Sequence, residues 1–89
     1  MSQTIYLTQY GLMAERHWKE FLPMRVKRLT AEGRLQEALF EAQETTLDEM
    51  ETLCQTLERD QKLTPQQAHD QAWELIREKY ILLPPENDA

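Results

Sequence analysis

The sequence predicts an all-α fold, a small helical domain of three to four helices around one long central helix. Three observations support this prediction. The chain contains only two glycines, Gly11 and Gly33, fewer than a β protein with many turns would need. Residues 34–60 contain neither glycine nor proline and are rich in strong helix formers. Apolar residues recur at helical spacing both before and after this stretch.

The chain is long enough for a single domain, which we place at residues 1–89. A chain of 89 residues buries little more than about 60% of the surface that its unfolded form exposes, so its core is expected to be thin. Residues 1–10 are expected to form an N-terminal arm, in which residues 5–7 could dock as an extended segment or a short strand. Residues 86–89 are expected to be a frayed tail.

The N-terminal third has a helical pattern that a proline interrupts. Thr8 is a candidate N-cap, Gly11 is expected to loosen the first turn, and apolar residues follow at helical spacing over residues 12–22. Pro23 either kinks one helix or begins a second one. We favour a kink or tight corner, after which the helix resumes and is capped at its C-terminus by Gly33.

The central helix is expected over residues 34–60, on the order of 40 Å at ~1.5 Å per residue. Its apolar side is formed by Leu35, Leu39, Leu47, Met50, Leu53, Cys54 and Leu57. A second set of residues repeats at the spacing of a single helix face. We call this set the acidic stripe: Glu37, Glu41, Glu44, Asp48, Glu51 and Glu58. Residue 41 lies about 200° round the helix from residue 39, so the stripe and the apolar side are nearly opposed.

The last helix has a strong predicted start. Thr64, Pro65 and Gln67 fit an N-cap, a first helical position and the second half of a capping box. Apolar residues follow as far as Tyr80, and two prolines at 84–85 stop the helix. Residues 80–84 either close the core or present an apolar patch. In a domain this small, the two tryptophans at 18 and 73 are expected to be core anchors.

Charge and cysteine usage narrow the partners and the compartment. Sixteen acidic and ten basic residues give a net charge of −6, which disfavours unaided binding to nucleic acid or to an anionic membrane. The single cysteine, Cys54, cannot form an internal disulfide, so a reducing compartment such as the cytoplasm is expected. The sequence shows neither a signal-peptide pattern nor an apolar run long enough to span a membrane.

The sequence carries no recognisable catalytic or cofactor motif. His17 has Glu20 three residues on, but one such pair is common on a charged helix, and His69 has no similar partner. Cys54 lies on the apolar side of the central helix, without the neighbouring positive charge that activates a thiol. We find no glycine-rich phosphate loop, nucleophile elbow or zinc-finger spacing. We therefore expect no enzyme activity, no cofactor and no metal.

Two charged surfaces remain as candidate sites. The acidic stripe either is solvated surface or opposes a basic partner, because it lacks the opposite charges at i,i+4 that usually stabilise a helix face. We call the other set the basic segment: Arg16, Lys19, Arg25, Lys27, Arg28 and Arg34. It either contacts phosphate or an acidic partner, or pairs internally with the central helix. Internal pairing is the favoured reading, because the chain as a whole is acidic.

Parts of the sequence resemble a family of small bacterial proteins, the transposon-encoded TnpV-like proteins. The resemblance rests on the runs Tyr10-Gly11, Arg16-His17-Trp18-Lys19-Glu20-Phe21-Leu22-Pro23 and Gly33-Arg34-Leu35, and on Ala72-Trp73 after the glutamate-rich stretch. It covers roughly residues 10–83. The resemblance implies a context of mobile DNA and its control, and it implies no mechanism.

Three functions are consistent with these observations. The first is a non-catalytic interaction domain that binds another protein, and that protein could itself be a basic, nucleic-acid-binding one. The second is an inhibitor of a nucleic-acid enzyme, of the anti-CRISPR kind, with the acidic stripe as a DNA mimic. The third is a nucleic-acid-binding accessory that works through the basic segment. A homodimer through the long helix is a further expectation, if the thin core leaves Leu and Met side chains exposed.

Overall fold

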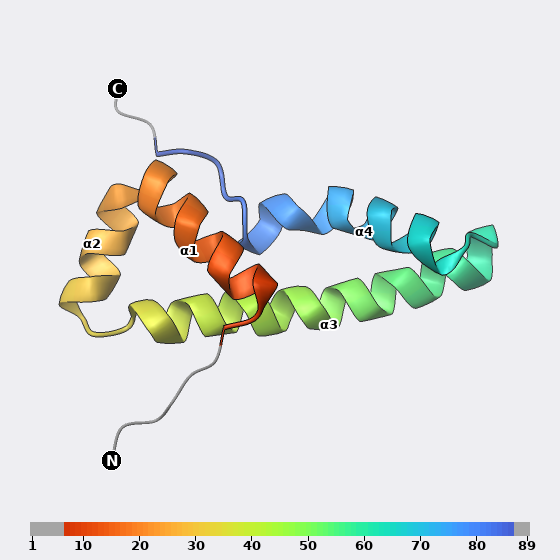
Figure 1. The fold of residues 1–89 in the computed structure, drawn as a ribbon, viewed down its shortest axis with the longest axis horizontal. Helices are drawn as coiled ribbons and strands as arrows, with labels where there is room; N and C mark the ends of the chain where they lie inside the picture. Colours follow the sequence, from red (N-terminus) through yellow and green to blue (C-terminus); the bar gives the residue numbers. More distant parts are fainter. Residues whose placement is uncertain (1–6, 87–89) are drawn as a thin grey trace, which may run out of the picture.

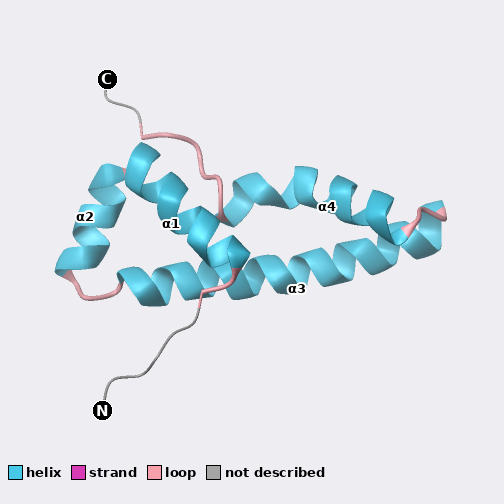
Figure 2. Cartoon of the chain, viewed as in Figure 1, coloured by secondary structure: helices cyan, strands magenta, loops and turns pink. Residues whose placement is uncertain are grey.

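The computed structural model describes residues 7–86, and within that range it consists of four α-helices without a strand (Figures 1 and 2). The helices are α1 (Gln9–Phe21), α2 (Pro23–Ala31), α3 (Leu35–Gln61) and α4 (Pro65–Tyr80). This confirms the predicted all-α class, and α3, with 27 residues, is the long central helix. Isoleucine 5 and tyrosine 6, which were expected to dock, lie outside the described residues.

The helices are arranged around α3 as a shallow assembly. Figure 1 shows α4 returning beside α3, while α1 and α2 form a V over the N-terminal part of α3. The Cα atoms span only 14 Å along the shortest axis. Two packed helices need about 13–15 Å, from an interaxial distance of ~8–10 Å and a Cα radius of ~2.3 Å on each side. The domain is therefore two helices deep, which agrees with the thin core expected from its length.

Pro23 separates two helices. Only Leu22 lies between α1 and α2, with φ −130° and ψ 54°, and Pro23 takes the first turn of α2. The tight corner favoured from the sequence is thus correct in position, but α2 is a separate helix and not the continuation of a kinked one. Two N–H groups at the start of α2 donate to the Glu86 carboxylate, from Met24 at 3.0 Å and Arg25 at 2.9 Å.

Gly33 ends α2 as predicted. It has φ +68°, and its N–H donates to the Thr30 carbonyl at 3.0 Å, while the Arg34 N–H donates to the Leu29 carbonyl at 2.8 Å. This pair of bonds is the Schellman arrangement, which glycine favours because it has no Cβ to clash in the left-handed region. The turn lets α3 begin two residues later.

The predicted start of α4 is also confirmed. The Thr64 side chain accepts a hydrogen bond from the Gln67 N–H at 3.2 Å, and the Thr64 N–H donates to Gln67 Oε1 at 3.1 Å. Both halves of the capping box are therefore present. The preceding helix, predicted to end at residue 60, ends at Gln61, and Lys62 after it adopts the left-handed conformation (φ 54°) without being glycine.

The core consists of two clusters that meet along α3. The first lies where α1, α2, α3 and the C-terminal segment converge, and includes Trp18, Leu39 and Ile81. The second lies between α3 and α4 and consists of Met50, Leu57, Ala68, Ala72 and Ile76. Trp73 and Tyr80 pack against both clusters. The small side chains at 68 and 72 are fully buried, so they allow α4 to approach α3 closely.

The C-terminal segment closes the core. Ile81 is completely buried, and its carbonyl accepts a hydrogen bond from the Trp18 indole N–H at 3.0 Å. Trp18 is therefore a core anchor, as predicted, and the apolar segment after α4 belongs to the core. Glu86 was assigned to a frayed tail, which is wrong for that residue, because its carboxylate caps α2 and its N–H donates to the Phe21 carbonyl at 3.0 Å. Residues 87–89 lie outside the described range.

Candidate functional site

The acidic stripe lies on the outer face of α3, directed away from both core clusters. All six of its carboxylates are on exposed residues. Within residues 7–86, none of them forms an ion pair with a lysine or arginine. One member, Glu44, accepts a hydrogen bond at its Oε2 atom from the Gln43 side chain at 3.3 Å. The stripe is therefore a row of charge that its own domain leaves uncompensated.

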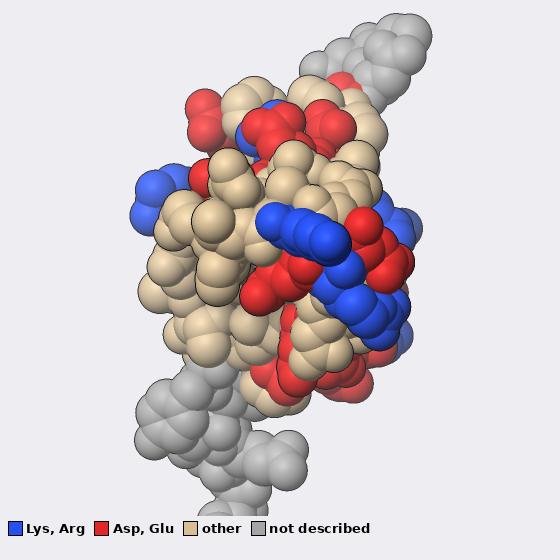
Figure 3. All heavy atoms as spheres, turned by 90° about the vertical axis from the view of Figure 1, so that its right-hand side faces the viewer, with Lys and Arg blue, Asp and Glu red and all other residues tan. Residues whose placement is uncertain are grey.

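The stripe is purely acidic only along residues 37–51. At the far end of α3, Glu58 is followed by Arg59, which pairs with Asp60 at 3.0 Å, and by the exposed Lys62. Figure 3 views the molecule from this end and shows basic and acidic side chains intermixed on one side, with a largely uncharged surface on the other. We infer that Glu58 contributes less to a single-sign surface than the other five members.

Two large apolar side chains border the stripe. Phe40 and Leu47 each expose 38% of their surface, and they are three or four residues from Glu44, so they adjoin it on the helix surface. Leu47 was predicted on the buried side of the helix, which is wrong. It lies about 80° round α3 from the fully buried Leu39, beyond the reach of α1 and α4. The outer face of α3 is therefore acidic with apolar spots.

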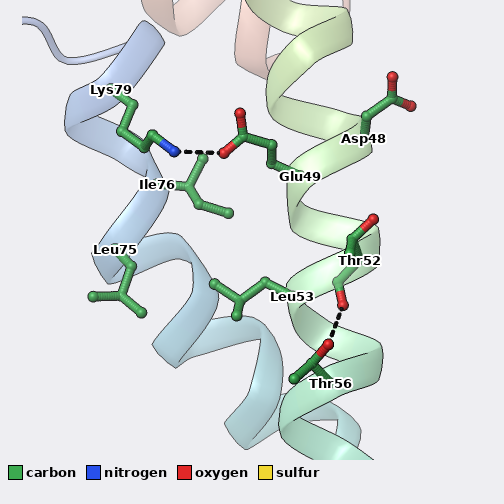
Figure 4. A pocket seen from close by; sticks show the side chains of 8 residues that line it. All are labelled: Asp48, Glu49, Thr52, Leu53, Thr56, Leu75, Ile76 and Lys79. Carbon is green, nitrogen blue, oxygen red and sulfur yellow. Dashed lines mark hydrogen bonds and ion pairs between the residues drawn. The ribbon is translucent and has the colours of Figure 1, made fainter.

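Neighbouring acidic residues on α3 point in opposite directions. Figure 4 shows Asp48 pointing away from α4, while Glu49 points across the groove between the two helices toward Lys79. Glu49 accepts hydrogen bonds from Lys79 Nζ at 2.7 Å and from the Tyr80 hydroxyl. The Lys79 bond, followed by the Tyr80 bond, lowers the pKa of Glu49 below its usual value. Glu49 is thus a structural link between α3 and α4 and not a member of the stripe.

This link between Glu49 and α4 predicts that the free energy of unfolding decreases at acidic pH. Because the pKa of Glu49 is lowered in the folded state, its contribution to the free energy of unfolding is present above its unfolded pKa of about 4.5 and is lost as pH falls through the lowered value. Urea unfolding of wild type and Glu49→Gln between pH 7 and pH 3 should show the difference shrinking in acid. Glu51→Gln, which removes an unpaired carboxylate, is the control. A wild-type advantage that does not change with pH would contradict the link.

The basic segment does not pair with the stripe. Lys19 Nζ lies 3.4 Å from Glu15, and Arg34 lies 3.9 Å from Glu32. The Arg25 guanidinium lies 4.7 Å from the centroid of the Trp18 ring. The remaining three residues of the segment are exposed: Arg16, Lys27 and Arg28. The favoured expectation of pairing with the acidic face of the central helix is therefore wrong for the described residues, because α1 and α2 pack on the opposite, apolar side of α3.

The histidines and the cysteine serve local contacts. His17 Nε2 lies 2.7 Å from the Leu83 carbonyl, to which it can donate, and His69 Nε2 lies 3.4 Å from the Tyr10 hydroxyl. Tyr10 in turn stacks on Trp73. Burial, and after it the charge of Glu58, raises the pKa of the half-buried Cys54 thiol. Across residues 7–86 no three His, Cys, Asp or Glu side chains come together in a way that could hold a metal ion.

The fold and the surface define an all-α domain whose most distinctive exposed feature is the acidic face of α3. Comparisons with protein-family models, with curated proteins and with solved structures found no match. Among the described residues, no helix is both long enough and apolar enough to cross a membrane. The family resemblance stays a prediction, and any statement about function must rest on the residues of this chain.

Proposed function

We propose that this protein is a non-catalytic, cytoplasmic interaction domain that binds a basic surface of another protein through the acidic stripe on α3. One observation carries the proposal. Along residues 37–51 a row of exposed carboxylates has no ion-pair partner within the described residues. Like charges at i,i+4 destabilise a helix by a few tenths of a kcal/mol per pair. A stripe of one sign therefore lowers the stability of α3, and no ion pair within the described residues offsets this loss.

The apolar residues beside the stripe support a protein as the partner. Phe40 and Leu47 interrupt the acidic face, and interfaces combine apolar anchors with surrounding charge. A basic protein surface with apolar depressions would match this combination. The acidic stripe would also raise the association rate and make it sensitive to salt.

A DNA-mimicking inhibitor of a nucleic-acid enzyme is the second candidate. The five carboxylates of the stripe from Glu37 to Glu51 follow one another about every 5 Å, at ~1.5 Å per residue. One DNA strand carries a charge every ~3.4 Å, so the stripe approaches this density without equalling it. The resemblance to transposon-encoded proteins is consistent with such a role. The lower charge density and the exposed apolar residues favour the first candidate.

The test compares two variants with the same change in net charge. The stripe variant replaces Glu41, Glu44, Asp48 and Glu51 with glutamine or asparagine. The control variant makes the same kind of replacement at four exposed residues outside α3: Glu20, Asp70, Glu74 and Glu78. Affinities are measured over a series of salt concentrations against the protein that co-purifies with the wild type from its native host.

The stripe variant should bind roughly fourfold to several hundredfold more weakly, since four charge pairs at ~0.2–1 kcal/mol each are lost. The control variant should bind like wild type. Equal weakening of both variants would show that net charge alone is responsible, and it would overturn the proposal. Displacement of nucleic acid from the partner by the wild type, and not by the stripe variant, would select the mimic over the general interaction domain.

A further inference from the structure

A cleft of about 400 Å³ lies where all four helices and the C-terminal segment meet. It lies between the helices, beside α3, and Glu41 at the edge of the acidic stripe forms part of its wall. Each helix supplies part of its lining, chiefly through Trp18, Arg25, Glu41, Lys79, Tyr80 and Leu83. Its volume is within the ~300–1,000 Å³ range of small-molecule sites. The cleft is therefore large enough for a ligand of a few to a dozen heavy atoms.

Arg25 is the residue of this cleft whose interactions are incomplete. It is half-buried, and its guanidinium lies 4.7 Å from the centroid of the Trp18 ring. Its Nε atom is buried without a hydrogen-bond partner, and within residues 7–86 no carboxylate lies within ion-pair distance of the guanidinium. The Glu86 carboxylate lies near Arg25, but it accepts a hydrogen bond from the backbone N–H of that residue. Burial of an N–H group without an acceptor costs free energy.

The remaining lining indicates the kind of acceptor that would fit. A guanidinium pairs best with acceptors that can present two oxygens side by side, carboxylate and phosphate. Lys79 adds a second positive charge, although it already pairs with Glu49. Glu41 contributes one negative charge at the same cleft, which disfavours a doubly charged phosphate more than a singly charged carboxylate. The half-buried ring of Tyr80 and the half-buried side chain of Leu83 offer an apolar surface to the rest of the ligand.

We propose that this cleft binds a carboxylate that is attached to an apolar or aromatic group. The carboxylate pairs with the guanidinium of Arg25, and the apolar group lies against Tyr80 and Leu83. Such a ligand is either a small free acid or the C-terminal carboxylate of a peptide. This site is separate from the stripe proposed above, and Glu41 is the one residue that belongs to both.

The test uses side-chain resonances in ¹⁵N NMR spectra of the full chain. The Arg25 Nε–H and the Trp18 indole N–H are followed while a probe is added. Phenylacetate represents the free acid, and N-acetylglycylphenylalanine represents the peptide terminus. Phenylacetamide and the peptide amide are their neutral counterparts. Phenyl phosphate is the phosphate counterpart. Saturable shifts with the acids, and none with the amides, are the expected result, and the tighter of the two acids identifies the source.

Four variants make the test specific. Arg25→Gln should weaken binding at least about tenfold, whereas Lys27→Gln, on the exposed surface of the same helix, should leave it unchanged. Glu41→Gln should strengthen binding a few-fold, because it removes the opposing charge. The same substitution, Glu41→Gln, should weaken the binding of a basic protein to the stripe. Because the two effects have opposite signs, this variant separates the two proposals. Arg25→Lys, which keeps the charge, shows whether the loss in Arg25→Gln reflects the guanidinium or a disturbed fold.

Several outcomes would overturn this inference. They are an absence of saturable shifts, equal shifts with acid and amide, tighter binding of phenyl phosphate than of phenylacetate, and full binding by Arg25→Gln. A fifth outcome concerns Asp88, which is near the C-terminus of the sequence. If Asp88→Asn alone shifts the Arg25 Nε–H resonance as far as saturating phenylacetate does, the acceptor belongs to the chain itself.

Discussion

Replacing Trp18 with alanine is expected to lower the free energy of unfolding by about 3–5 kcal/mol. Trp18 exposes only 1% of its surface and lies in the cluster that joins α1, α2, α3 and the C-terminal segment. The substitution removes this packing and also the hydrogen bond from the indole N–H to the Ile81 carbonyl. A domain of this length has about 4–13 kcal/mol of stability in total. The loss would therefore leave a substantial unfolded population.

Urea unfolding followed by circular dichroism measures this loss, and Trp18→Phe is the matched control. Phenylalanine keeps an aromatic ring in the core but leaves the Ile81 carbonyl without its donor, so a smaller loss of about 1–3 kcal/mol is expected. Equal losses for the two variants would mean that the hydrogen bond, and not the packing, dominates. A loss below about 1 kcal/mol for the alanine variant would contradict the central position of Trp18.

Gly11→Ala is expected to lower the free energy of unfolding by about 2 kcal/mol, although the same change in an exposed helix would raise stability by ~1 kcal/mol. Gly11 is buried on α1 against α3. A Cβ atom there would lie 2.5 Å from Gln43 Oε1 and 2.9 Å from Leu7 Cβ. Because Gln43 Oε1 also accepts the hydrogen bond from the Thr8 hydroxyl at 3.0 Å, it cannot move without breaking that contact. Overpacking of this kind typically costs ~1–3 kcal/mol.

The sign of the effect at Gly11 is the decisive result. In a Gln43→Ala background the contact with Oε1 no longer exists, so the cost of Gly11→Ala should fall. Gly33→Ala provides a second comparison, because a Cβ at Gly33 would meet nothing within 4 Å. Its cost, about 1–2 kcal/mol, comes only from the left-handed conformation. A stabilised Gly11→Ala protein would mean that α1 and α3 are not in close contact at this point.

Local signals predicted the helices well and the crossings between them poorly. The Thr64 capping box and the Gly33 cap depend on residues that are adjacent in sequence, so their chemistry could be read directly. The role of Gly11 could not, because it depends on Gln43 from another helix. The sequence interpretation took Gly11 as a loosened first turn, whereas the structure uses it for a close approach. Thr8 takes the predicted N-cap position, but its hydroxyl bonds Gln43 and does not cap α1.

The candidate surfaces show the same division. Helical periodicity predicted the acidic stripe, and all its members are exposed as a single-face pattern requires. Periodicity could not separate Asp48 from Glu49 by role, because the position of Lys79 on α4 decides which one is paired. It also could not reveal the cleft at Arg25, since each of the four helices contributes to its wall. Leu47 shows the limit within one helix: an apolar residue beyond the edge of the packed face stays exposed.

The last described residues seal the corner formed by the first two helices. Trp18 bonds Ile81, His17 bonds Leu83, and Glu86 caps α2, so each contact spans more than sixty residues of sequence. During synthesis, α1 and α2 leave the ribosome long before these partners exist. The corner therefore stays open until residues 81–86 have been synthesised, and its closure carries the entropy cost of a long loop. A chain that terminates before residue 81 would expose the Trp18 cluster, which makes such a product a target for quality-control proteases.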